Sequence, residues 1–148
     1  IVGQKPVSVQ ALGNNITTKG TKQKYNDFVT LLLSFDNQMI IKISAHGGCV
    51  HPHFHSLKLF GKKLSFIHDT TNTVWVESSN PDKLFKKEHS NYPAKTERGK
   101  VLLSFCESLI NNIKKPIVND DEVFTTTSIC LAAEQAVKMG QKINIEYL

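Results

Sequence analysis

The sequence is poor in cysteine and arginine and has no long apolar run. Its 3 cysteines are odd in number and widely spaced, which argues against a disulfide framework and favours a reducing, cytoplasmic compartment. Arg98 is the only arginine, whereas nucleic-acid surfaces typically cluster arginine with aromatic residues, so nucleic acid is not an expected partner. Polar residues interrupt the apolar stretches well before the roughly 20 residues that a membrane span needs, so no membrane partner is expected either.

The short motifs of nucleotide and acyl-transfer chemistry are also missing. No GxGxxG or P-loop pattern occurs, and Gly47-Gly48, the only glycine pair, follows a strand pattern but opens no helix. No serine lies in a nucleophile elbow. The chain by itself is therefore expected to bind no nucleotide cofactor.

What the sequence does contain is the composition of one globular domain. With 148 residues, 40% of them hydrophobic and 21% charged, the chain is long enough to bury a core, and we expect a single domain over residues 1–148. The net charge of +5 comes mostly from lysine spread along the chain, as on a solvated surface. Cys106 and Cys130 fall on apolar helix faces and are expected to be small core residues.

Short apolar or alternating runs dominate the first half of the chain and predict strands. Asp36-Asn37-Gln38 and Gly61-Lys62-Lys63 supply turns between neighbouring runs, which predicts a pair of hairpins. A polar, threonine-rich stretch over residues 16–24 is a candidate edge strand, and the proline-containing residues 78–98 are expected to form an irregular excursion. The predicted strands cover residues 7–12, 25–35, 39–46, 57–60, 64–68 and 73–77.

The C-terminal part predicts a helix, a loop, a second helix and a last strand. Residues 101–113 have apolar side chains at helical spacing on one face. Asn119 and Glu122 form a capping box at the start of the second helix, and Gly140 provides its C-terminal stop. Apolar and polar residues then alternate over residues 143–147, as in a half-buried strand. Strands followed by helices predict an α+β fold with a mostly antiparallel open sheet, covered on one face by helices.

One predicted hairpin strand is apolar on both of its faces. Val29, Leu31 and Leu33 point to one face, while Phe28 and Leu32 point to the other. Helices cover only one face of such a sheet, so the second, half-apolar face is expected to meet a second domain or a second subunit. We therefore expect a homo-oligomer formed through the free sheet face.

The most unusual local run lies over residues 46–55, which contain His46, His51, His53 and His55. If this run is extended, the last three imidazoles project from one face and could chelate a metal, but the nearest carboxylate is Asp69. The alternatives are a polar loop whose imidazoles hydrogen-bond a ligand and a purely structural role. We assign these histidines to substrate binding and assign no metal ligand.

A second candidate binding site precedes the first predicted helix. Arg98 and Lys100 stand where the backbone N–H groups of a helix N-terminus would suit a phosphate or a carboxylate. The alternative is a solvated loop whose charges contribute little. We include both residues among the candidate substrate contacts.

Phe28–His46, Leu57–Phe66 and Phe105–Leu148 together carry a family resemblance. In this order they resemble the hairpin, the strand–GTKG–strand hairpin and the closing helix–loop–helix–strand of one family's C-terminal domain. That family is the glucose–fructose oxidoreductase, inositol dehydrogenase and rhizopine catabolism (Gfo/Idh/MocA) family, and the resemblance covers nearly the whole chain. Turn positions depart from the pattern, because Gln38 and Leu64 stand where the family has glycine.

The resemblance implies a division of labour between domains. In the family an N-terminal Rossmann domain binds NAD or NADP, while the C-terminal domain helps to form the substrate cleft and commonly the oligomer interface. The family's active-site Lys-Pro motif and its His-x-x-x-Asp helix have no counterpart here, and Lys5-Pro6 lies in the wrong place, so no catalytic residue is assigned. The end of the return strand and the following loop, His46–His55, correspond to a region that approaches the substrate cleft in relatives.

The function implied by the resemblance is that of a C-terminal substrate-binding and oligomerisation domain. The parent protein would be an NAD(P)-dependent oxidoreductase that transfers hydride to or from a sugar, a polyol or a nucleotide-linked sugar. Its partners would be that substrate, a Rossmann domain absent from this chain and further copies of itself, and NAD or NADP would bind only the full-length protein. The alternatives are a metal-binding module that uses the histidine-rich run and a non-catalytic dimerisation scaffold.

Overall fold

The structure, a computed structural model, describes residues 3–69, 73–77, 79–87, 98–111 and 115–148. The chain folds into two compact units, the first formed by Ile1–Val50 with Lys115–Leu148 and the second by His51–Lys114. Their boundary falls inside the histidine-rich run, between Val50 and His51. No helix in the described part of the chain is long and apolar enough to cross a membrane.

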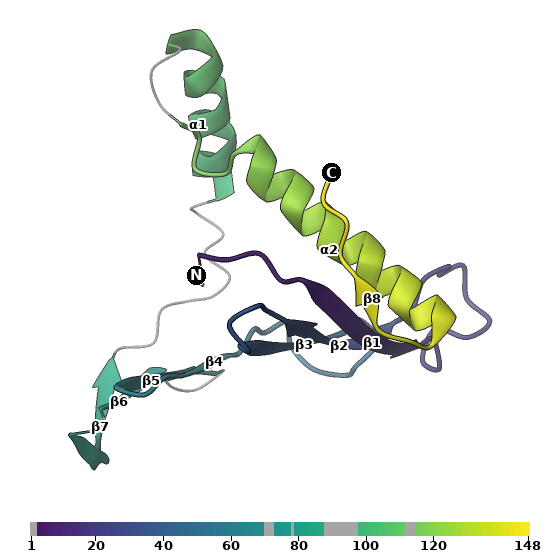
Figure 1. Cartoon of the computed structure of the whole chain (residues 1–148). Coiled ribbons are helices and arrows are strands. Elements are labelled where there is room, and N and C mark those ends of the chain that lie inside the picture. Colours follow the sequence, from purple (N-terminus) through teal and green to yellow (C-terminus); the bar gives the residue numbers. More distant parts are fainter. Residues whose placement is uncertain (1–2, 70–72, 78, 88–97, 112–114) are drawn as a thin grey trace. The chain divides into compact units, whose positions relative to one another are not determined.

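The first unit is an antiparallel sheet with a helix on one of its faces (Figure 1). The predicted hairpin is confirmed, because its strands pair from Phe28 opposite His46 to Ser34 opposite Ile40. The terminal strand is present but is only 2 residues long. Helix α2 (Asp120–Met139) packs against a sheet in which β3 (Ile40–His46), β2 (Phe28–Ser34), β1 (Ser8–Asn14) and β8 (Ile143–Asn144) lie in that order.

Alternation along the strands sends one set of side chains towards α2, where they form the core of the first unit. Leu31 and Leu33 of β2 lie on this face, as the sequence predicts. Removing a large apolar side chain from water stabilises the fold by roughly 1.5–3 kcal/mol, so this face holds the unit together. The buried core residues are Val9, Ala11, Leu33, Phe35, Ala132, Ala133, Ala136 and Ile145.

Both ends of α2 have the predicted caps. The side chain of Asn119 accepts a hydrogen bond from the backbone N–H of Glu122, and the Glu122 carboxylate accepts one from the N–H of Asn119, each at 2.9 Å. At the other end Gly140 adopts the left-handed conformation, with φ 66°, and its N–H bonds the carbonyl of Ala136. These contacts satisfy backbone groups that a helix end otherwise leaves without partners.

Residues 16–24 form turns and not the edge strand considered from the sequence. Thr21 donates its backbone N–H (3.0 Å) and its hydroxyl (2.7 Å) to the carbonyl oxygen of Thr18, and the intervening Gly20 has φ 83°. Threonine hydroxyls that bond nearby backbone groups compete with strand pairing, which explains the difference. The edges of this sheet are β3 and β8 instead.

The second unit contains another antiparallel sheet, in which β4 (Leu57–Phe60), β5 (Leu64–His68), β6 (Thr73–Glu77) and β7 (Asn80–Lys87) lie in that order. The hairpin predicted around Gly61-Lys62-Lys63 is confirmed, and Gly61 N donates to the carbonyl of Leu64 at 3.1 Å. The strands β4 (Leu57–Phe60), β5 (Leu64–His68) and β6 (Thr73–Glu77) have the bounds expected from the sequence.

An irregular excursion was predicted over residues 78–98. This prediction is wrong for most of the residues in that range that the structure describes. Strand β7 (Asn80–Lys87) pairs with β6, and helix α1 (Arg98–Asn111) already begins at Arg98, whereas residues 88–97 lie outside the described part. Pro81 argued against a strand because proline cannot donate to a ladder. An edge strand such as β7 tolerates it, since its outer N–H groups need no partner in the sheet.

The expectation that Cys106 and Cys130 are core residues is wrong, because both are exposed. Cys130 lies beside a narrow buried stripe of α2 that consists of small residues such as Ser128 and Ala132. Cys106 lies on α1, whose Leu102 is also 67% exposed. Helical periodicity locates an apolar stripe, but only packing determines which part of that stripe is covered.

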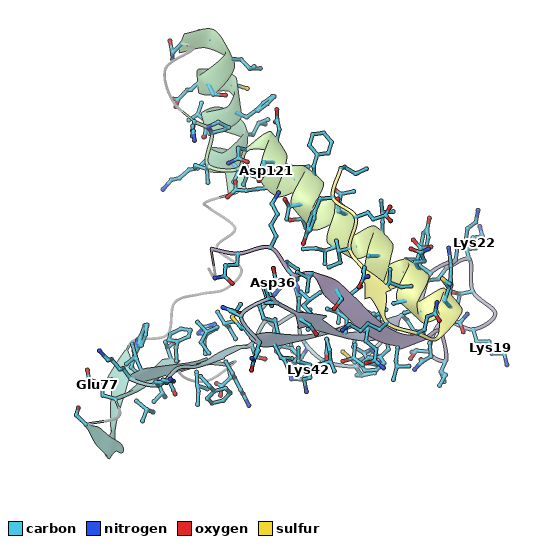
Figure 2. All side chains as sticks on the ribbon, in the orientation of Figure 1. Lys19, Lys22, Asp36, Lys42, Glu77 and Asp121 are labelled. Carbon is cyan, nitrogen blue, oxygen red and sulfur yellow. The ribbon has the colours of Figure 1, made fainter. Side chains whose placement is uncertain are left out.

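The sheet face opposite α2 is half apolar, as predicted. Leu12, Leu32 and Ile40 come from neighbouring strands and are 68%, 43% and 68% exposed. Lys42 lies opposite Leu32 in the register and is on this same face (Figure 2). Exposed apolar side chains gathered on one face are typical of an interaction surface.

Candidate functional site

His46 ends β3 on the open face of the sheet, directly opposite Phe28. The two rings lie 5.2 Å apart, and Gly48 N donates a hydrogen bond of 3.2 Å to His46 Nδ1. Because Nδ1 accepts this bond, the neutral imidazole carries its proton on Nε2, which is then a donor for a ligand. The structure therefore fixes the ring and the tautomer of this predicted site residue.

His51, His53 and His55 begin the second unit in a segment that is not a strand, so their rings do not form the single row considered for an extended chain. His51 packs on Phe54, with ring centroids 4.6 Å apart, whereas His53 and His55 face each other. The Nε2 atoms of His53 and His55 are 3.0 Å apart, so one imidazole donates to the other. Pro52 lacks the N–H that strand pairing requires, which explains why the segment is irregular.

The imidazoles of His53 and His55 face each other and are a candidate pair of metal ligands. Zinc sites in proteins typically use about three or four protein ligands. Within the described residues, no group of three or more His, Cys, Asp or Glu side chains is placed to hold a metal ion. The geometry therefore gives no support to the alternative of a metal-binding module.

Arg98 and Lys100 lie in the first turn of α1 and not in a loop before it. The first turn of α1 itself contains no acidic residue, and an anion placed there would meet the partial positive charge of a helix N-terminus. The helix therefore begins three residues earlier than the predicted Val101, so both residues lie inside its first turn, and anion binding there stays a prediction.

Asp27 is a buried carboxylate that sequence reasoning did not single out. It is only 6% exposed, and its Oδ2 accepts hydrogen bonds from the backbone N–H of Thr18 (2.7 Å) and from the Thr18 hydroxyl (2.9 Å). Its backbone N–H donates to the carbonyl of Asn14, and its own carbonyl accepts from Gly47 N at 2.6 Å. Asp27 therefore ties the β1–β2 loop to the segment that follows His46. The available sequence signal was a carboxylate immediately before an apolar strand.

A cavity of about 280 Å³ lies beside Asp27 in the first unit. Asp27 Oδ1 is buried and has no hydrogen-bond partner among the described residues. Polar side chains from the β1–β2 loop form much of the wall, and the end of β3 completes it. The lining residues are Thr18, Gln23, Asn26, Asp27, Val29, Ala45 and Gly47.

Comparison with known proteins finds likeness in structure and not in sequence. No family model and no curated protein matches this chain. A candidate oxidoreductase from Thermotoga maritima matches 97% of the chain with 15% identity and a TM-score of 0.77. Levoglucosan dehydrogenase in complex with NADH and levoglucosan matches 97% with 10% identity and a TM-score of 0.73. The WlbA dehydrogenase from Bordetella pertussis, in complex with NADH and UDP-GlcNAcA, matches 98% with 13% identity and a TM-score of 0.60.

The chain spans less than half of each of these structures, namely 42%, 46% and 41% of their lengths in the same order. At such low identity the matches establish the fold alone. The sequence resemblance and the structural likeness nevertheless point to one architecture: open antiparallel sheets with helices, equivalent to one part of a larger oxidoreductase. The chain has the α+β fold of the C-terminal domain of Gfo/Idh/MocA-type oxidoreductases.

Proposed function

We propose that this chain is the substrate-binding and oligomerisation domain of an NAD(P)-dependent oxidoreductase that acts on a sugar, a polyol or a nucleotide-linked sugar. The observation that carries the proposal is the fold match over 97–98% of the chain to dehydrogenases whose structures contain NADH together with levoglucosan or UDP-GlcNAcA. The odd, widely spaced cysteines, all exposed and free, fit a reducing, cytoplasmic setting.

In this proposal the histidines bind substrate and do not perform the reaction. His46 offers Nε2–H as a donor, because its Nδ1 is occupied by the N–H of Gly48. His53 and His55 are exposed, and the hydrogen bond between their Nε2 atoms holds the two imidazoles together as polar groups that a sugar hydroxyl would meet. Arg98 and Lys100, at the start of α1, would meet an anionic group of the substrate.

NAD or NADP belongs to the parent protein in this proposal, because the residues of this chain do not fit a dinucleotide. A Rossmann site needs parallel strands joined by helices, with a glycine-rich turn at a helix N-terminus. All strand pairs in the described part of the chain are antiparallel. We therefore expect no measurable NADH binding by residues 1–148 alone.

Oligomerisation would use the open sheet face of the first unit. Leu12, Leu32 and Ile40 would be buried against a second copy, and Lys42 would lie among them. Burying such side chains stabilises an interface at about 25 cal/mol per Å² of apolar surface. The face is built on strands in regular register, and two copies would meet through the same residues of each.

A hydride-transfer assay tests the enzymatic part of the proposal. The full-length gene product that contains this chain is incubated with NAD⁺ or NADP⁺ and a panel of sugars and polyols, and NAD(P)H absorbance is followed. We expect turnover with at least one substrate. His46→Ala and His53→Ala should each raise KM about tenfold while changing kcat little, because a hydrogen bond to the bound substrate is lost.

Lys58→Ala is the matched control for the assay, because Lys58 is an exposed residue of β4, just beyond the histidine-rich run. Its kinetic constants should equal those of the unmodified protein. Turnover by residues 1–148 alone would contradict the proposal, and so would unchanged KM values in both histidine variants.

Light scattering tests the oligomer. Leu32→Asp places a charge in the centre of the open face and should convert a dimer or larger assembly into monomers. Leu131→Asp is the control, because Leu131 is a similarly exposed leucine (54%) on α2, away from that face. A monomer before any substitution, or equal masses for both variants, would overturn this part of the proposal.

A further inference from the structure

The cavity beside Asp27 is separate from the histidines. It is lined by Val29 and Ala45, which are opposite each other in the register and share the sheet face on which Leu31 lies. His46 is the next residue after Ala45 and therefore points to the other face. A ligand in this cavity would not contact the imidazole of His46, so the inference does not rest on the dehydrogenase proposal.

The walls of the cavity are held in place by close contacts at glycines. A Cβ built on Gly13 would lie 2.7 Å from Asn26 Nδ2, and a Cβ built on Gly48 would lie 2.7 Å from Thr17 Cβ. The end of the Asn26 side chain is flexible and can shift, whereas a Cβ on Gly48 has no room beside Thr17, so the β1–β2 loop is seated tightly on the segment after β3. The backbone around the cavity is therefore largely preformed, whereas the side chains of Gln23 and Asn26 must move to admit a ligand.

The chemistry of the cavity is set by the carboxylate of Asp27. One oxygen accepts both hydrogen bonds from Thr18, while Oδ1 is buried and has no partner among the described residues. A buried acceptor without a donor costs about 1–3 kcal/mol, and more when it is charged. A ligand that supplies a donor to Oδ1 recovers this free energy. Such a ligand enters by moving the flexible side chains of Gln23 and Asn26, which are exposed.

The charge of the surrounding loop favours a neutral donor over a cation. Lys19, Lys22 and Lys24 all belong to the β1–β2 loop, and Figure 2 shows Lys19 and Lys22 on its outer side. Their positive potential attracts a cationic ligand poorly, and the single carboxylate repels an anion at short range. The other polar lining side chains, those of Thr18, Gln23 and Asn26, are neutral groups that both donate and accept.

We propose that this cavity binds a neutral polyhydroxylated small molecule, with one hydroxyl donating to Asp27 Oδ1 and a neighbouring hydroxyl bonding the amide of Asn26 or Gln23. Adjacent hydroxyls match adjacent carboxylate and amide groups, as in other sites where a few polar groups orient a ligand. The volume of about 280 Å³ is sufficient for a single sugar or cyclitol ring.

NMR titration of the ¹⁵N-labelled protein with myo-inositol and with glucose tests the proposal. We expect saturable shifts of the backbone amides of Thr18, Asp27 and Gly47 at ligand concentrations of up to about 50 mM, as for a site of millimolar affinity. Asp27→Asn keeps the shape of the side chain but replaces the charged acceptor, and it should weaken binding about tenfold. Glucamine, which carries an ammonium group beside its hydroxyls, should bind no more tightly than glucose.

A second pair of variants keeps the test decisive if Asp27→Asn unfolds the loop. Asn26→Ala and Gln23→Ala remove lining side chains outside the Asp27–Thr18 hydrogen bonds, and each should weaken binding about threefold. Lys22→Ala and Lys58→Ala are controls and should leave the affinity unchanged. The proposal is overturned if neither polyol shifts these amides, if the shifts occur only at residues 51–55, or if glucamine binds more tightly than glucose.

Discussion

Gly48 lies directly against Thr17: a Cβ added to Gly48 would come within 2.7 Å of both Cβ and Cγ2 of Thr17. The contact brings the β1–β2 loop onto the segment that follows β3. It lies beside the hydrogen bond from Gly47 N to the carbonyl of Asp27, so the same short region holds the loop by packing and by polar contact. The adjacent glycines therefore have unequal structural roles.

Replacing Gly48 with alanine should destabilise the protein by about 1–3 kcal/mol, because the new methyl group overpacks a close contact with Thr17. Gly47→Ala is the matched control, since a Cβ there would meet only the carbonyl oxygen of Asp27 at an ordinary 3.7 Å. Urea unfolding of both variants measures the difference. Equal stability of the two variants would show that the loop does not sit against Gly48 in solution.

Gln38 is the residue with positive φ, 68°, in the turn between β2 and β3. The left-handed conformation costs a residue with a side chain roughly 1–2 kcal/mol, whereas the added flexibility of glycine costs about 0.4–1 kcal/mol. Gln38→Gly should therefore stabilise the protein by about 0.5 kcal/mol, as measured by its unfolding midpoint in urea. Gln38→Ala keeps the strained backbone and should give no such gain; a destabilised Gln38→Gly would argue against a left-handed turn at this position.

Asn119 and Glu122 cap α2 reciprocally, each through a hydrogen bond of 2.9 Å. Asn119→Ala leaves the N–H of Glu122 without its acceptor and should lower the free energy of unfolding by about 1 kcal/mol. Asn119→Asp keeps a side-chain oxygen at the helix N-terminus and should retain most of the stability. Thermal unfolding of the three proteins is the measurement, and a loss of equal size in both variants would rule out capping as the cause.

Tyr147 packs against the core of the first unit and is tied to the N-terminal segment, because its hydroxyl donates to the carbonyl of Pro6 and Lys5 Nζ lies 5.1 Å from its ring centroid. Burial raises the pKa of Tyr147 above its ordinary value of 10.0, because the buried site disfavours the phenolate. A group whose pKa is raised on folding contributes stability that is fully present below the unfolded pKa and is lost as pH rises through the folded pKa.

The stability of the protein relative to Tyr147→Phe should therefore decrease over the pH range that begins near 10 and extends through the raised pKa of Tyr147. Below that range the variant should be less stable by about 1 kcal/mol, since it lacks the hydrogen bond to Pro6. Urea unfolding at several pH values measures both effects. Tyr25→Phe serves as the control, because Tyr25 is 71% exposed, and a pH-independent difference for Tyr147→Phe would contradict the assigned burial.

Elements whose determinants are close together in the chain were predictable. The β2–β3 hairpin follows from apolar runs on either side of a three-residue turn, and the start of α2 follows from Asn119 and Glu122. Residues 80–87 were not predictable, because their strand conformation comes from pairing with β6 and their composition resembles a loop. Residues 16–24 were ambiguous for the opposite reason, since threonine favours strands in general but here bonds its own backbone.

The candidate site likewise contains features that were predictable from the sequence and features that were not. The position of His46 at the end of a strand was correct, and the helix near Arg98 was expected but begins three residues earlier than predicted. The pairing of His53 with His55 and the burial of Asp27 were not foreseen. Both depend on the path of an irregular segment, for which the sequence offers no periodicity.

The order of amino acids was already enough to establish the α+β class, most strands and the caps of α2, because hydrophobic period and capping act over a few residues. The folded chain alone determines which apolar face α2 covers, why Cys130 is exposed and how Asp27 is enclosed by Thr18 and Gly47. These features arise from contacts between segments that are separate in sequence, where burial must outweigh the entropy of bringing them together.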